Sequence, residues 1–298
     1  MNTSSLTFST NPFFKSSPPD KAVRLRNHFY EKFKRHIVLL LEQKKTRKVS
    51  ARKGLLNPRT LYRHRFSDNV FQRTIRKESS DTTIIFLVDG SGSMNYRDPD
   101  AAEGCTRLEI CAAVASAFAK ANRTVLKNQI PIEVFIKSAP PVWSRSLTGT
   151  DHGSMVVLSR VFSSHSKGND FDKLLRLDPQ SPIVDNNGNY DGSYTSEFAV
   201  LPALHKWMKG NVRTKKCIVF NLTDGEAYCS LGQHHYNFRS GDNKAMRLKY
   251  LKGIPNLTLL LGGRSDPVQM GDVYGDNFIS AETDFAGSLF KSFAQFLE

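Results

Sequence analysis

Apolar residues follow a helical spacing near the start of the chain. They recur every four residues between basic side chains, as expected for one buried face of a helix. The positions are Leu25, Phe29, Phe33, Ile37 and Leu41, and Asp20 stands where the N-cap of such a helix is expected. This face must be covered either by the rest of the chain or by a partner, whereas the basic side chains between these positions form a solvated face.

From Thr82 onward, the pattern changes to short apolar runs that alternate with helical segments. The runs TTIIFLV (82–88) and CIVFNL (217–222) are rich in β-branched and aliphatic residues, which is typical of strands buried on both faces. Further strands are predicted at 132–136, 156–162, 257–261 and 277–279, and helices at 107–126, 196–208, 244–251 and 284–297. This alternation predicts an α/β fold with a doubly wound, mainly parallel sheet.

The polar segments divide the chain into three parts. Residues 1–20 are rich in Ser, Thr, Pro and Asn and are predicted to form a disordered tail. Residues 21–78 are predicted to be a basic helical extension and linker, in which 44–59 is the linker. Residues 79–298 are predicted to form the α/β domain, which a loop-rich stretch at 163–195 interrupts.

The positive charge of the chain is confined to the second of these parts. The whole chain has a formal net charge of +14, and residues 21–78, with 18 basic and four acidic residues, carry that same net charge. Such a density of Lys and Arg is typical of a segment that contacts phosphates or an acidic protein surface. The candidate contacts lie in the linker and are Lys44, Lys45, Arg47, Lys48, Arg52 and Lys53.

Composition and targeting signals indicate the compartment. No apolar run approaches the roughly 20 residues that span a bilayer, and the first residues lack the basic and apolar regions of a secretory signal. The four cysteines are scattered and form no C-x-x-C pair. We therefore expect a protein of a reducing cytoplasm that does not contact a membrane.

Hydroxyl and carboxylate side chains follow two of the predicted strands. The sequence Asp89-Gly90-Ser91-Gly92-Ser93 comes directly after the first strand, and Thr223-Asp224-Gly225 comes directly after CIVFNL. The carboxyl ends of parallel strands share one edge of a sheet, so the two loops are expected to meet. Because no Cys or His is among these groups, their oxygen atoms favour a hard cation, namely Mg²⁺, Mn²⁺ or Ca²⁺.

Other chemistries are disfavoured by the motifs. Cys217, Cys229, His234 and His235 have a spacing that fits no common zinc module. The chain lacks the G-x-S-x-G elbow of serine hydrolases and the G-x-x-x-x-G-K-[ST] loop of ATPases. We therefore expect no catalysis from this chain on its own.

The strand-end motifs resemble a known family. The D-x-S-x-S spacing of DGSGS, followed later by TDG, is similar to the metal-ion-dependent adhesion site of von Willebrand factor A domains, which have a Rossmann-like fold. The wider pattern resembles the carboxyl-terminal A domain of the cobaltochelatase CobT subunit. The similar pieces are FLVDGSGSM (86–94), NYDG (189–192), VFNLTDGEA (219–227) and AETDFAGSLF (281–290).

The resemblance implies a set of metal ligands. Ser91 and Ser93 would bind the metal through their hydroxyls, and Asp89 and Asp224 would bind it directly or through waters. A third loop supplies another ligand, for which Asp191 in NYDG is the best match. Ser193 stands where the chelatase-type branch has a Glu, so Thr195 competes with Asp191 for this role, and a plain Asp-Gly turn is the alternative for Asp191.

The resemblance also implies partners. In this family one coordination position of the metal is filled by an Asp or Glu of a partner protein. Chelatase-type A domains work beside a hexameric AAA+ ATPase of the MoxR or CobS kind. The chain is therefore predicted to be an adaptor between such an ATPase and an acidic client protein. A protein of this kind is expected from a bacterium or from a bacteriophage, in which case it would act in the host cytoplasm. Two alternatives stay open: a nucleic-acid-binding protein that uses residues 44–59, and a subunit of a cobalt or magnesium chelatase complex, although the long acidic amino-terminal region of that subunit is missing.

Overall fold

The computed structural model describes part of the chain. The described residues are 16–45, 47–51, 55–56, 71–75, 82–97, 104–138, 157–165, 170–177, 183–184, 190–191, 200–225, 240–261, 271, 273–275 and 278–280. The tail predicted at 1–20 lies mostly outside this set, and the helix predicted at 284–297 lies wholly outside it.

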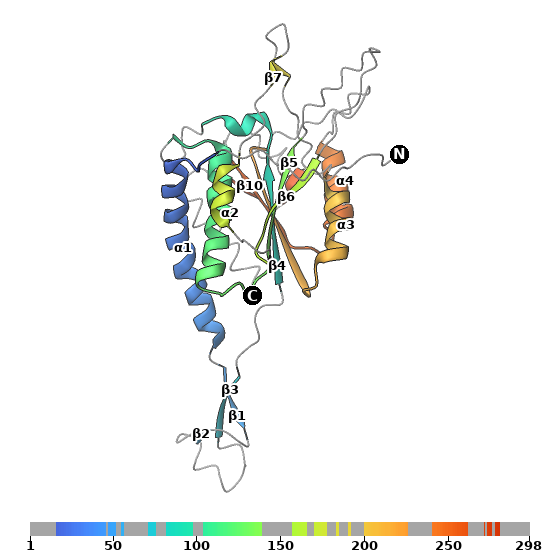
Figure 1. Ribbon diagram of the computed structural model, residues 1–298. Coiled ribbons are helices and arrows are strands. Elements are labelled where there is room, and N and C mark those ends of the chain that lie inside the picture. Colours follow the sequence, from blue (N-terminus) through green and yellow to red (C-terminus); the bar gives the residue numbers. More distant parts are fainter. Residues whose placement is uncertain are drawn as a thin grey trace.

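A six-stranded sheet forms the centre of the molecule (Figure 1). Its order is β6-β5-β4-β9-β10-β11, and every pairing is parallel except that of β5 with β6. The strands are β4 (Thr82–Asp89), β5 (Ile132–Ser138), β6 (Val157–Ser163), β9 (Lys216–Thr223), β10 (Asn256–Leu260) and β11 (Phe278–Ser280). The chain thus winds outward from β4 in one direction and from β9 in the other, which confirms the predicted doubly wound, mainly parallel sheet.

Helices cover both faces of this sheet, because its central strands are apolar on both sides. Ile84, Phe86 and Val88 of β4 belong to the core on one face, and Ile85 and Leu87 belong to the core on the other. The first core is covered by α1 (Asp20–Lys45) and α2 (Arg107–Thr124), and the second by α3 (Leu201–Asn211) and α4 (Ser240–Tyr250) (Figure 1).

Helix α1 is packed on the α/β domain along its first half. Its apolar side chains Leu25, Phe29 and Phe33 are buried, which confirms the predicted helical face at these positions. The ring centroid of Phe33 lies 4.3 Å from that of Phe118 on α2, which in turn lies 5.3 Å from that of Phe86 in the sheet. The side chains of Ile37 and Leu41 lie outside the described residues.

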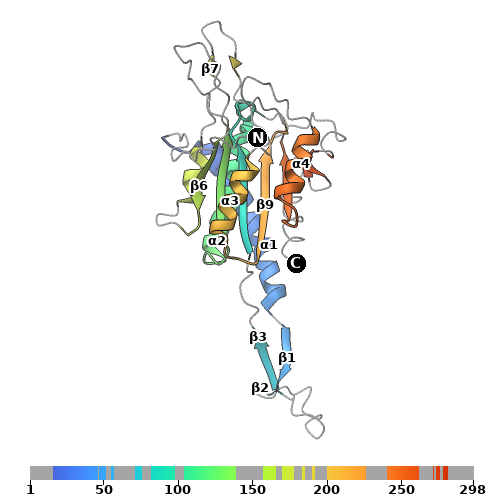
Figure 2. The ribbon, with the colours of Figure 1, turned by 90° about the vertical axis from the view of Figure 1, so that its right-hand side faces the viewer.

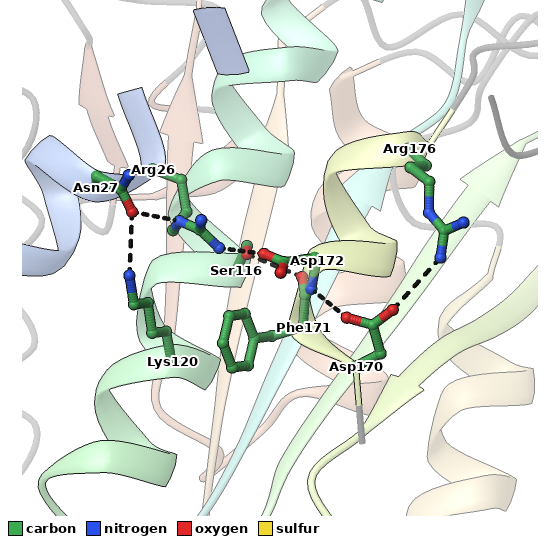
Figure 3. A network of polar contacts seen from close by, with 8 residues as sticks. All are labelled: Arg26, Asn27, Ser116, Lys120, Asp170, Phe171, Asp172 and Arg176. Carbon is green, nitrogen blue, oxygen red and sulfur yellow. Dashed lines mark hydrogen bonds and ion pairs between the residues drawn. The ribbon is translucent and has the colours of Figure 1, made fainter. Parts of the chain in front are cut away.

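A polar network reinforces the packing of α1 on α2 (Figure 3). The Arg26 guanidinium of α1 is buried, forms an ion pair with Asp172 and lies over the Phe171 ring, both in the 3-10 helix η4 (Phe171–Arg176). Asn27 accepts hydrogen bonds from Arg26 at 2.9 Å and from Lys120 of α2 at 3.0 Å. Buried apolar and polar contacts therefore both join α1 to the domain.

Part of the segment expected to be a linker forms a small antiparallel sheet. Strand β3 (Phe71–Ile75) pairs with β1 (Arg47–Ala51) on one side and with β2 (Leu55–Leu56) on the other. Pairing between strands this far apart in the sequence cannot be inferred from a local pattern. This β arm projects from the end of α1, away from the carboxyl ends of the central strands (Figures 1 and 2).

The remaining elements are short. They are the 3-10 helix η2 (Gly92–Asn95) after β4 and the two-residue strands β7 (Ile183–Val184) and β8 (Tyr190–Asp191), which pair antiparallel. In the part of the chain that the structure describes, no helix has the length and apolar character needed to cross a membrane.

Candidate functional site

The first candidate side chain, Asp89, is the last residue of β4 and is fully buried. Its Oδ1 atom accepts a hydrogen bond from the backbone N–H of Ser91 at 2.9 Å. Its Oδ2 atom accepts one from the Thr223 hydroxyl at 2.8 Å. Both carboxylate oxygens are therefore fixed by neighbouring donors, which offsets part of the cost of burying the charge.

A tight turn brings the two serines together after Asp89. The N–H of Gly90 donates to the carbonyl of Lys137 at 2.8 Å, and a Cβ atom on Gly90 would lie 2.9 Å from the Ile136 side chain. A side chain at this position would therefore require Ile136 to shift, which glycine avoids. Beyond it the chain enters η2, and the Ser91 and Ser93 hydroxyl oxygens lie 3.0 Å apart.

The second loop begins where β9 ends. Thr223 is the last residue of β9, and both Thr223 and Asp224 are buried. Gly225 has a φ of 83°, in the left-handed region that favours glycine, and its N–H donates to the Thr223 hydroxyl at 3.2 Å. The Thr223 hydroxyl thus organises both loops, since it also donates to Asp89.

These loops meet where the winding direction of the sheet reverses. Strands β4 and β9 are adjacent and parallel, and the chain leaves them toward opposite edges of the sheet. Open α/β sheets bind their ligands at this point, outside the carboxyl ends of the strands. The prediction that the two loops come together is confirmed by the hydrogen bond between Thr223 and Asp89.

Two basic side chains that the sequence analysis missed contact the carboxylates. The Lys137 ammonium lies 4.0 Å from Asp89 Oδ2, and both side chains are fully buried. Arg107 Nη1 donates to Asp224 Oδ2 at 3.0 Å. A signal existed for Lys137, because it directly follows the strand predicted at 132–136, and the register pairs it with Asp89.

Cys111 of α2 lies close enough to the site to sense its charges. Burial, followed by the negative charges of Asp89 and Asp224, raises the pKa of its thiol well above the ordinary value. The thiol therefore stays protonated, whereas a metal-binding cysteine must lose its proton. Cys111 is fully buried and belongs to the apolar core on this face of the sheet.

The two loops offer hydroxyl and carboxylate oxygens, the donor types that a hard cation prefers. Within the described residues, His, Cys, Asp and Glu side chains form no group of three or more that could hold a metal, so a cation beside Asp89 and Asp224 would need further oxygen ligands. Adjacent ligands of an octahedral Mg²⁺, with bonds of about 2.1 Å, are about 3.0 Å apart. The Ser91 and Ser93 hydroxyl oxygens are hydrogen-bonded to each other at 3.0 Å, a separation that also matches this spacing. The residues fit a hard cation.

The other predicted ligands are not positioned. The backbone of Asp191 lies in β8 and pairs with Ile183, but its side chain is outside the described part, as is all of Thr195. Arg52 and Lys53 also lie outside the described residues. Helix α1 ends with Lys44 and Lys45, and strand β1 begins with Arg47 and Lys48, but only their backbones are described. These assignments stay predictions.

The alternative zinc site is not supported by the one member that the structure describes. Burial raises the pKa of the Cys217 thiol to about 12, the opposite of what a thiolate ligand needs. Cys229, His234 and His235 lie outside the described residues.

Comparison with known proteins identifies no family. No family model matches the sequence, and no curated protein matches it. Among solved structures, the chain is similar to proximal thread matrix protein 1 from the mussel byssus, with 12% sequence identity and a TM-score of 0.39. The similarity covers 74% of this chain and 46% of that protein.

Proposed function

We propose that this chain is a metal-dependent protein-interaction module, in which a divalent cation at the Asp89 site receives a carboxylate from a partner. The observation that carries the proposal is the meeting of two hydroxyls and two buried carboxylates at the switch point of the sheet. The D-x-S-x-S and TDG resemblance to von Willebrand factor A domains supports the same function. Mg²⁺ is the preferred ion, and Mn²⁺ and Ca²⁺ offer the same oxygen chemistry.

Each side chain has a defined role in this proposal. The Ser91 and Ser93 hydroxyls hold the ion without neutralising it, and the cation supplies a positive centre that attracts an anionic ligand. Asp224 would provide a carboxylate ligand from the second loop, and Asp89 orients the serine loop through the Ser91 N–H. Thr223 keeps the Asp224 loop against Asp89.

The partners are proposed from the resemblance to the CobT subunit. They are an AAA+ ATPase of the MoxR or CobS kind and an acidic client protein, between which this chain would act as an adaptor. No catalytic group is assigned to this chain. Participation in a cobalt or magnesium chelatase complex is the related alternative, for which binding of a corrin or porphyrin to the purified chain would be required.

A metal titration with Ser93→Ala tests the metal site. At about 100 times its dissociation constant, Mg²⁺ should stabilise the folded state by about 2.7 kcal/mol, which raises the melting temperature by about 5 °C. Ser93→Ala should abolish this shift and the EDTA-sensitive capture of a partner. Asn95→Ala, an exposed residue of the same turn, should leave both unchanged. Equal melting temperatures with Mg²⁺ and with EDTA in the wild type would overturn the proposal.

Nucleic-acid binding by the β arm is the second candidate function. The favouring observation is that Lys44 and Lys45 end α1 and Arg47 and Lys48 begin β1 of the arm, which lies at the opposite end of the molecule from the carboxyl end of β9 (Figure 2). A ligand on the arm would therefore leave the Asp89 site accessible. Duplex DNA and RNA are bound largely through their phosphates, which require a high density of Lys and Arg and little further geometry.

Neutralisation of the arm tests this second function. A variant in which four basic residues become Gln should lose affinity for duplex DNA, and the slope of log affinity against log salt should fall by about four. These residues are Lys44, Lys45, Arg47 and Lys48. The matched control changes four exposed basic residues of the body, namely Lys206, Lys209, Arg213 and Lys215. Equal DNA affinity in both variants would reject nucleic-acid binding by the β arm. Binding of the arm to an acidic protein and not to DNA would reject it as well.

A further inference from the structure

The Asp89 site contains its own positive charges. Lys137 faces Asp89 and Arg107 contacts Asp224, so the four charges of the two pairs cancel. Three of the four side chains are almost completely excluded from solvent, and only the Arg107 side chain keeps a measurable exposure, 16%. Because an isolated buried charge is very costly, such mutual neutralisation stabilises the site in the absence of any added ion.

Arg107 joins the three elements that surround the site. It is the first residue of α2, whose N-terminus is fixed by a capping box between Thr106 and Glu109. Its backbone N–H donates to the carbonyl of Tyr96, directly after the serine turn, at 3.1 Å. Its guanidinium reaches the Asp224 loop. Arg107 thus holds Asp224 while its backbone holds the serine loop.

Neutralisation changes what a divalent cation meets at this site. An ion that approached two unpaired carboxylates would be neutralised by them, whereas an ion added to this set of four charges brings the total to +2. The four charges together therefore give the ion no net attraction, and once the ion is bound, the excess positive charge attracts an anion. Burial strengthens this attraction, because charges interact more strongly where water is excluded.

We infer that the divalent cation and the anionic partner bind this site cooperatively, and that Arg107 sets the strength of this coupling. The inference rests on the proposed function and specifies its regulation. In the absence of a carboxylate ligand the protein keeps Asp224 on Arg107 and binds Mg²⁺ weakly. A partner carboxylate offsets the excess charge, so the ion and the partner each raise the affinity of the site for the other by the same factor.

Calorimetric titration of the full chain with Mg²⁺ tests the coupling, with sodium acetate as the carboxylate probe. The reference titration uses sodium chloride at the same ionic strength. The two titrations are compared at equal concentrations of free Mg²⁺. In the wild type, acetate should raise the Mg²⁺ affinity about tenfold, within the roughly 5–150-fold range of measured couplings. In Arg107→Gln, Mg²⁺ alone should bind about tenfold more tightly than in the wild type. Acetate should raise the Mg²⁺ affinity of this variant by a smaller factor than in the wild type.

Arg123→Gln is the matched control, because Arg123 is an exposed residue near the other end of α2. It should behave as the wild type does. If Mg²⁺ binds the wild type and Arg107→Gln with equal affinity and acetate changes neither, the coupling is overturned and the metal site stands. If Mg²⁺ binds neither protein in either salt, the proposed function fails and the coupling fails with it.

Discussion

Replacing Asp89 by alanine is expected to lower the free energy of unfolding by about 3–5 kcal/mol. The substitution removes the carboxylate that neutralises Lys137, whose side chain is fully buried. It also removes the acceptor of two hydrogen bonds, one from the Ser91 N–H and one from the Thr223 hydroxyl. Urea unfolding followed by circular dichroism measures the change.

A double variant separates charge from packing in this result. In Asp89→Ala combined with Lys137→Met, both charges are absent, and an apolar chain of similar length replaces the lysine. The two residues are in contact, so their effects should not add. The double variant should therefore be more stable than Asp89→Ala alone. A single variant within about 1 kcal/mol of the wild type would show that the pair contributes little to the fold.

Replacing Phe33 by alanine is expected to cost about 3–5 kcal/mol, the range for large-to-small changes of buried aromatic residues. Phe33 has no exposed surface and joins the stack that runs through Phe118 to Phe86. The cavity would open between α1 and the domain, because Phe33 belongs to the helix and Phe118 to α2. The same unfolding measurement applies.

Arg35→Ala provides the comparison for Phe33→Ala. Arg35 lies two residues further along the same helix and is exposed, so its removal should change stability by less than about 0.5 kcal/mol. A comparably small loss for Phe33→Ala would mean that α1 is dispensable for the α/β domain. A large loss would make α1 part of the folding unit.

The central sheet was predictable because of where its strands are buried. Strands β4 and β9 are covered on both faces, so their sequences are continuous apolar runs that stand out from the rest of the chain. The polar residues that follow each run then mark the carboxyl edge of the sheet. Sequence reasoning therefore brought Asp89, Ser91 and Asp224 into one region without any knowledge of the strand order.

The charges that complete the site were not predictable in the same way. Arg107 follows a capping threonine, and the sequence places it at the start of a helix, but its contact with Asp224 spans 117 residues. That contact depends on how α2 is oriented toward the end of β9. The β arm escaped prediction for the same reason, because β1 acquires its hydrogen-bonding partner only through the register with β3.

Helix α1 connects the two ends of the molecule mechanically. It has 26 residues, which corresponds to a rod of about 39 Å. At its first turn, Lys21 forms a 2.8 Å ion pair with Glu109 of α2, two residues from Arg107, and its last turn leads into the β arm. A force applied to the β arm would therefore be transmitted along α1 to the N-terminus of α2. A shift of that first turn of α2 would move the Arg107 guanidinium, which contacts Asp224.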